Sequence, residues 1–144
     1  MSRDDPLRSL VIELQYLEST AQTLQQRISL IDAAVMEMQL AQSTIEGLKN
    51  ESPGSDILVP VGGGSYVRAK VGDNERLIVG IGADVAIEKT PTEAFESFSA
   101  RIADLQKARS SLEQDLERVL GGLAKGRQEL QRLARQKSEG KVDV

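Results

Sequence analysis

The sequence predicts an α+β protein: a long antiparallel two-helix coiled coil with two central β-hairpins that join an intermolecular β-barrel. Three observations predict this class. One apolar heptad seam runs through residues 1–50, a second runs through residues 91–144, and residues 51–90 between them have the composition of strands and turns. These ranges are the predicted domains: an N-terminal coiled-coil helix, two β-hairpins that serve as an oligomerisation platform, and a C-terminal coiled-coil helix.

The N-terminal helix is predicted from Leu7 to Lys49. Steps of three and four residues from Leu7 meet an apolar residue at eleven of twelve positions, and the exception is Gln42. A mean spacing of about 3.5 residues keeps one apolar stripe on one side of a helix, which is typical of a coiled coil. Asp5 followed by Pro6 is a suitable start, because Pro is tolerated at the first helical position.

The C-terminal helix is predicted over residues 91–137. The same steps from Phe95 meet an apolar residue at ten of twelve positions, and the exceptions are Arg109 and Gly126. Residues 90–93 (Thr-Pro-Thr-Glu) match a capping box with Pro at the first helical position. Polar seam positions such as Arg109 usually set the register of a coil.

The two helices are expected to pair with each other in antiparallel orientation. The segment between them is too short and too strand-like to carry the chain back along a helix of about 65–70 Å. Antiparallel pairing places both chain ends at the same far end of the coil. Residues 1–50 carry 4 basic and 7 acidic side chains, and residues 101–144 carry 10 and 7. The opposite net charges of the arms favour their pairing.

The middle of the chain is predicted to form two β-hairpins. Gly, Asp and Asn separate four runs that are rich in β-branched residues: 57–61, 65–71, 76–82 and 85–88. The second run alternates, which places Val67, Ala69 and Val71 on one face. The same alternation places Tyr66 on the other face, with two charged side chains.

Four strands in two hairpins cannot form a stable sheet by themselves. Isolated hairpins are marginally stable in water, and their outer strands leave backbone groups unpaired. The chain has no further strands to supply. We therefore expect an obligate oligomer in which several chains pool their hairpins into a closed sheet or barrel.

The composition removes several classes of function. The chain has no Cys and no His, which excludes disulfides, thiol catalysis, the commonest metal ligand and the usual general base. Its net charge is −4, whereas nucleic-acid binders usually carry a basic excess. No stretch approaches about 18 consecutive apolar residues, and the N-terminus lacks an apolar signal core. We expect a cytoplasmic protein that is not an enzyme, with no cofactor, metal, nucleic-acid partner or membrane segment.

Two glycine-containing segments, residues 61–65 and 80–84, invite an interpretation as nucleotide-binding loops. The first lacks the Gly-Lys-Ser/Thr ending of a phosphate loop, and the second lacks the third glycine of a dinucleotide fingerprint. The favoured interpretation is that these glycines supply positive φ angles in turns and bulges. The carboxylates show no calcium-loop spacing and are expected to be solvated charges.

Three glycines, Gly121, Gly122 and Gly126, lie inside the predicted C-terminal helix. Each costs about 1 kcal/mol relative to Ala in a helix interior. One interpretation is close helix packing or a locally weak coil. The other is a flexible point that lets the outer arm bend or splay, and the sequence leaves both open.

The far end of the coil is a candidate binding surface, called the distal tip below. Its apolar residues come from the start of the first helix and the end of the second: Leu7, Leu10, Val11, Leu14, Leu130 and Leu133. Only short polar ends lie beyond them. These residues form either an ordinary seam that frays or an exposed apolar surface that binds an apolar ligand.

The order helix, two hairpins, helix, together with two motifs, resembles the alpha subunit of archaeal prefoldin. The motifs are LVPVGGGSYV at residues 58–67, which opens the hairpins, and VGIGADVAIEK at residues 79–89, which closes them. The resemblance covers nearly the whole chain. The coil arms are generic and the hairpin motifs are specific. Two hairpins favour the alpha class, because beta-class subunits have one. The helical glycines at 121, 122 and 126 depart from the family's pattern.

This resemblance implies a chaperone that works without ATP. Two alpha subunits and four prefoldin beta subunits would pool their hairpins into two β-barrels, from which six coiled coils project. The six residues of the distal tip match, by position, the surface that would bind unfolded client proteins and deliver them to a group II chaperonin. The residues that would match the assembly platform are Val59, Val61, Val67, Val71, Leu77, Val79, Ile81, Val85 and Ile87.

An alternative function is a structural coiled-coil scaffold subunit without client binding, whose strands serve only assembly. Serine in place of Leu10, Leu14, Leu130 and Leu133 would separate the two functions. Only a chaperone would keep its oligomer and lose suppression of client aggregation.

Overall fold

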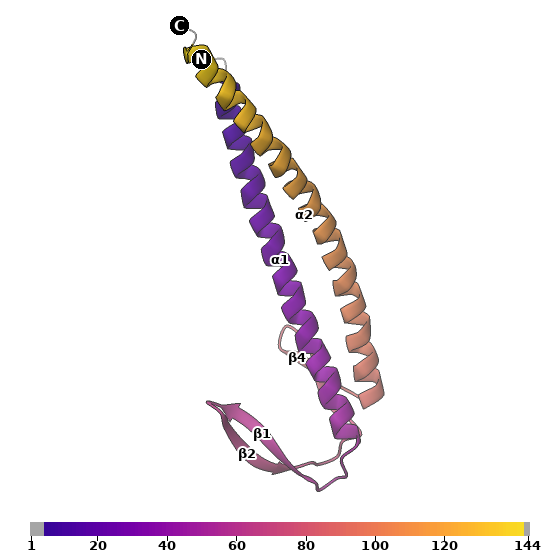
Figure 1. Ribbon diagram of the computed structural model, residues 1–144. Coiled ribbons are helices and arrows are strands. Elements are labelled where there is room, and N and C mark those ends of the chain that lie inside the picture. Colours follow the sequence, from indigo (N-terminus) through magenta and orange to yellow (C-terminus); the bar gives the residue numbers. More distant parts are fainter. Residues whose placement is uncertain (1–4, 143–144) are drawn as a thin grey trace. The chain divides into compact units, whose positions relative to one another are not determined.

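The computed structural model describes residues 5–142, which form two helices and four strands (Figure 1). The elements in chain order are α1 (Pro6–Lys49), β1 (Asp56–Gly62), β2 (Ser65–Lys70), β3 (Leu77–Gly82), β4 (Val85–Lys89) and α2 (Pro91–Val142). The predicted α+β class and the order helix, two hairpins, helix are confirmed. The second helix runs beyond its predicted end at residue 137.

Both helices begin where the sequence predicts. The carbonyl oxygen of Asp5 accepts hydrogen bonds from the N–H groups of Arg8 and Ser9, at 3.1 and 3.2 Å. At the start of α2, Thr90 Oγ1 accepts a bond from the N–H of Glu93, at 3.2 Å, as the capping box predicts. In a capping box the glutamate reaches back to the backbone N–H of the N-cap residue. Here the Glu93 carboxylate instead accepts a hydrogen bond from the hydroxyl of Thr90, at 3.0 Å.

The described chain divides into two compact units. Unit 1 joins residues 5–32 of α1 to residues 106–142 of α2, and unit 2 comprises residues 33–105 with both hairpins. Each unit has its own apolar cluster.

Unit 1 is an antiparallel pair of helices held by the predicted seam. Its buried cluster is formed by Leu14, Ala21 and Leu123. Half-buried apolar residues of both helices pack on this cluster: Leu10, Leu17, Leu116, Val119 and Leu130. Leu14 lies against Gly126 and Leu17 lies against Gly122, so the residue numbers rise in α1 as they fall in α2. The seam and the antiparallel direction are therefore confirmed in this unit.

Unit 2 contains the other ends of the helices and packs one hairpin on them. Its cluster joins Ile45 of α1, Val79 of β3 and Ala94 of α2. Gln42, the one polar seam residue of α1, bridges the two helices. Its Nε2 atom donates bonds to the carbonyl oxygen of Phe95 at 3.0 Å and to Oγ of Ser99 at 2.7 Å.

The strands form two separate antiparallel hairpins, β1–β2 and β3–β4. In each hairpin a glycine with φ near 105° marks a bulge, Gly62 at 106° and Gly82 at 104°. The two turn residues that follow have positive φ, at 59° and 73° for residues 63–64 and 51° and 60° for residues 83–84. Two positive φ angles in a two-residue loop define the type I′ turn, which suits the twist of the flanking strands. The glycines thus serve the turns and bulges, as predicted.

The second hairpin repeats the first at a distance of twenty residues. The bulges at positions 62 and 82 and the turns at 63–64 and 83–84 are each separated by this interval. Apolar strand residues follow the same rule, so that Leu58 corresponds to Ile78 and Val59 corresponds to Val79. This repeat is not among the sequence predictions.

Candidate functional sites

One face of the first hairpin is apolar and open to solvent. Directly opposed residues of an antiparallel pair lie on the same face, and the register places Ile57 opposite Ala69 and Val59 opposite Val67. Val59 is 40% exposed and Val67 is 51% exposed. The hairpin therefore presents an apolar strand surface of the kind that a neighbouring strand or chain would cover.

The other face of this hairpin is mixed. It carries an ion pair between Lys70 Nζ and Asp56 Oδ1, at 3.2 Å. It also carries Leu58, opposite Arg68, and Tyr66, which are 62% and 61% exposed. Alternation predicted Tyr66 on a charged face, and these two apolar residues were not identified as interface candidates.

The second hairpin has one face on its own helices. Val79 and Ile87 are directly opposed. Val79 is buried against Ile45 and Ala94. On the opposite face Ile78 is 78% exposed. The run of adjacent apolar residues at 77–79 was the signal that could have identified it, because a strand covered on both faces loses its alternation.

The nine residues predicted for the assembly platform differ in how far their side chains are exposed. Six have exposed side chains: Val59, Val61, Val67, Ile81, Val85 and Ile87. Leu77 is half-buried, whereas Val71 and Val79 are buried within the single chain. Val79 packs on Ile45 and Ala94 of its own chain. A contact of any of the nine with another subunit stays a prediction.

The six residues of the distal tip lie at one end of unit 1. Leu7 and Leu133 line a small hollow of about 290 Å³. Leu10 and Leu130 pack on the buried cluster and are half-buried. The remaining two differ strongly in accessibility, because Val11 is 37% exposed while Leu14 is 7% exposed.

More accessible apolar side chains lie beside the distal tip. Ile12 and Tyr16 are 58% and 71% exposed and are separated by four residues, so they neighbour each other on α1. They lie off the seam, and a search for seam residues missed them.

An ion-pair network replaces apolar packing at the polar seam position of α2. Arg109 contacts Asp32 through two bonds, from Nε to Oδ1 at 2.6 Å and from Nη2 to Oδ2 at 3.2 Å. It also contacts Glu113 on its own helix. A bidentate pair fixes the positions of both helices, which fits the predicted role in register.

Two ion pairs lower the pKa values of their carboxyl groups, the pair of Asp32 with Arg109 and the pair of Glu129 with Arg132. The hydrogen bonds of Arg109 hold the pKa of Asp32 below its ordinary value, against the opposing effect of desolvation. The hydrogen bonds of Arg132 lower the pKa of Glu129 in the same way, one turn away on α2. Both carboxylates are therefore charged at neutral pH.

The helical glycines differ in their surroundings. A Cβ atom on Gly121 would meet open space, and one on Gly122 would lie 3.5 Å from Cδ1 of Leu17 in ordinary contact. A Cβ atom on Gly126 would overlap the side chain of Leu14. Gly126 is thus closely packed against Leu14 of α1.

Two kinds of feature are absent from the described residues, a cluster of metal-binding side chains and a membrane-spanning helix. Within residues 5–142 no group of three or more carboxylates is arranged to hold a metal ion. Neither helix, over its described length, contains a stretch apolar enough to cross a lipid bilayer.

Comparison with known proteins agrees with this architecture. The family described as Prefoldin subunit matches residues 17–136. Prefoldin subunit alpha of Methanopyrus kandleri is 39% identical over 110 residues, which are 76% of this chain and 70% of that protein. Prefoldin subunit alpha of Pyrococcus horikoshii is 33% identical over 130 residues, which are 87% of each chain. A chain in the cryo-EM structure of filamentous PFD from Methanocaldococcus jannaschii shares the fold, with a TM-score of 0.70 and 24% identity over 78% of this chain and 93% of that one.

Proposed function

The chain belongs to the prefoldin family, and on this premise we propose that it is the alpha subunit of an ATP-independent holdase. Two copies assemble with four beta subunits through their hairpins. The distal tips bind unfolded proteins and deliver them to a group II chaperonin in the cytoplasm. The subunit performs no catalysis.

The observation that carries the assembly is the exposed apolar surface of the strands. Leu58 and Ile78, at equivalent positions of the two hairpins, are 62% and 78% exposed. Burying one such side chain fully contributes about 1.5–3 kcal/mol. An isolated hairpin is also marginally stable in water. Joining the hairpins of several subunits would cover these side chains and pair the free strand edges.

The distal tip supports the binding of unfolded proteins. Leu7 and Leu133 are half-buried and line one small hollow at the end of unit 1, and Val11 beside them is exposed. Such surfaces have little shape specificity and bind weakly. Several tips in one assembly would raise the effective concentration of contacts and give avidity.

Native mass spectrometry of a tagged copy from its own host tests the assembly. The expected complex contains two copies of this chain and four of a shorter coiled-coil chain. A homo-oligomer, or a complex with an unrelated protein, would contradict the proposed composition.

An aggregation assay then tests the activity. The assembly is expected to suppress aggregation of a chemically denatured protein without ATP. Unchanged aggregation in the presence of an intact assembly would favour the alternative of a structural scaffold.

A further inference from the structure

A second apolar surface lies on one flank of unit 1, away from the distal tip. A shallow hollow of about 470 Å³ is lined by residues of both helices: Arg27, Leu30, Ile31, Ala108, Ser111 and Leu112. We call it the flank groove. Its floor includes the half-buried seam residues Ile31 and Leu112. The seam is accessible here because α2 presents two small side chains, Ala108 and Ser111, where longer ones would cover it.

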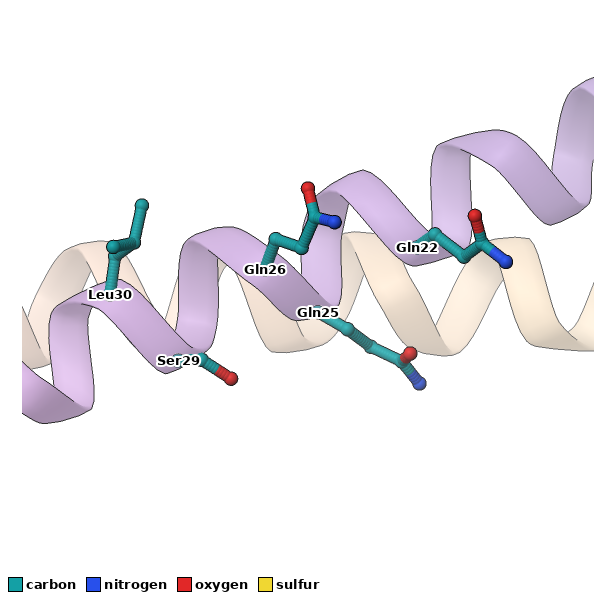
Figure 2. Close-up of a pocket in the computed structure, with 5 residues that line it drawn as sticks. All are labelled: Gln22, Gln25, Gln26, Ser29 and Leu30. Carbon is teal, nitrogen blue, oxygen red and sulfur yellow. The ribbon is translucent and has the colours of Figure 1, made fainter.

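Leu30 separates the flank groove from a second hollow of about 550 Å³ on α1. The other residues that line this second hollow are Gln22, Gln25, Gln26 and Ser29. Figure 2 shows Gln22, Gln26 and Leu30 pointing to the same side of the helix. Amide and hydroxyl groups can both donate and accept hydrogen bonds, and they carry no charge. This wall can therefore bond an exposed peptide backbone whatever its sequence.

One charged side chain, that of Arg27, lines the flank groove. Arg27 is exposed and, within the part of the chain that the structure describes, forms no ion pair. The neighbouring carboxylates Asp32 and Glu113 are both engaged by Arg109. A ligand that brings its own carboxylate to this place would pair with Arg27.

We propose that the flank groove binds extended segments of unfolded polypeptide that carry a large apolar side chain next to an acidic one. The apolar side chain packs on Leu30, Ile31 and Leu112, the carboxylate pairs with Arg27, and the backbone bonds to the amide wall. This choice of ligand follows from three features of the surface taken together: its apolar floor, the cation Arg27 and the neutral hydrogen-bonding groups. The inference rests on the proposed function for its ligand and adds a site and a charge preference.

The spacing of the two surfaces suits one bound segment. Leu7 and Leu30 are 23 residues apart on α1, which is about 34 Å along a helix at 1.5 Å per residue. An extended chain covers this distance with about ten residues at 3.3–3.6 Å each. A segment held at the distal tip can therefore also reach the flank groove, and two weak contacts on one segment reinforce each other.

Fluorescence anisotropy on the full chain in its native assembly tests the proposal. The probes are two labelled 15-residue peptides that alternate Leu with Asp or Leu with Lys. The matched variants are Leu30→Ser and Leu40→Ser, because both leucines are exposed on α1, at 71% and 67%, and Leu40 lines neither hollow. Leu30→Ser is expected to weaken binding of the Leu/Asp peptide about tenfold, as the loss of one leucine contact implies. Arg27→Glu is expected to reverse the preference between the two peptides.

Two results would overturn the inference. One is an equal effect of Leu30→Ser and Leu40→Ser, and the other is the same affinity of the wild-type assembly for both peptides. Suppression of aggregation of a denatured protein, measured on the same samples, separates this outcome from failure of the proposed function. If the wild-type assembly suppresses aggregation while peptide binding gives either of these two results, only the flank groove is disproved. If peptide binding follows the expected pattern and the assembly does not suppress aggregation, the flank groove is supported and the holdase function is contradicted.

Discussion

Gly126 of α2 lies so close to Leu14 of α1 that a Cβ atom at position 126 would overlap Cδ2 of the leucine. The same atom would lie 3.9 Å from the side chain of Leu10. Leu14 belongs to the buried cluster of unit 1, and the missing side chain at 126 gives it space. The loss of helix propensity at this glycine is therefore offset by packing between the helices.

Gly126→Ala is expected to destabilise the coil, whereas Gly121→Ala is expected to stabilise it. Alanine at either position gains about 1 kcal/mol of helix propensity. At position 121 it meets open space, but at position 126 it overpacks the core, which typically costs about 1–3 kcal/mol. Thermal unfolding followed by circular dichroism measures both. Equal rises in the midpoint would show that Leu14 relaxes without loss.

Ala83→Gly is expected to stabilise the second hairpin. Ala83 has a φ angle of 51°, and a left-handed conformation costs a residue such as alanine about 1–2 kcal/mol, whereas Asp tolerates it better. The equivalent position of the first hairpin is Gly63, with a φ angle of 59°, so Gly63→Ala is the matched control and should lose a similar amount. The urea midpoint is the measurement. A lower midpoint for Ala83→Gly would mean that the entropy that glycine adds to the unfolded chain outweighs the relief of strain.

Acid is expected to weaken the coil through Asp32 and Glu129. Their folded pKa values lie below the ordinary values of 3.8 and 4.5. As the pH falls through this range, the unfolded chain takes up these protons first, so stability declines. Above the ordinary values the contribution of both pairs is complete. Unfolding midpoints at about pH 7, 5 and 3 should show the loss, and Asp32→Asn should reduce it. An unchanged pH profile in that variant would contradict the role of the pair with Arg109.

Val67→Lys is expected to block assembly and leave the chain folded. Val67 is 51% exposed on the open face of the first hairpin, so the charge is tolerated until a neighbour covers it. Val79→Lys should destabilise the chain itself, because Val79 is buried against Ile45 and Ala94. Native mass spectrometry with circular dichroism distinguishes the two effects. Normal assembly of Val67→Lys would exclude this face from the platform.

Serine at the accessible residues of the distal tip is expected to impair the holdase and keep the assembly. The variant combines Leu7→Ser, Val11→Ser and Leu133→Ser, and a severalfold higher concentration should be needed to suppress aggregation. Leu14→Ser is the contrasting variant, because truncating a buried leucine costs about 2–5 kcal/mol and should unfold the coil. The four-serine variant suggested by the sequence includes this change, so it does not separate the two functions as expected. Wild-type suppression by the triple variant would show that the distal tip is not the binding surface.

The sequence was sufficient to predict the helices and the four strands. Heptad spacing depends on burial of one stripe, and six residues of the stripe on α1 are buried: Leu14, Ala21, Leu24, Ile28, Val35 and Ile45. The helix starts at Asp5 and Thr90 follow from local capping chemistry. The sequence offered close packing and flexibility as alternatives for Gly126 and could not decide between them, because the packing depends on which residue of the other helix lies opposite.

The surfaces were less predictable than the elements. Alternating apolar and polar residues indicate that a strand has an apolar face. They do not indicate whether the chain's own helices or another subunit cover that face. Val79 is therefore a core residue while its counterpart Val59 is exposed. The flank groove depends on Ala108 and Ser111 lying opposite Leu30, a relation between helices that neither seam reveals.

The two hairpins, built on one plan twenty residues apart, double the number of strand edges that the subunit offers for pairing. Each two-stranded hairpin has two edges that no other strand of residues 5–142 pairs, so the chain offers four such edges where a subunit with a single hairpin offers two. The repeat also supplies a comparison inside one molecule. A substitution in the first hairpin can be made again at its counterpart in the second. The difference between the two changes in stability then measures how much the surrounding residues contribute at equivalent strand positions.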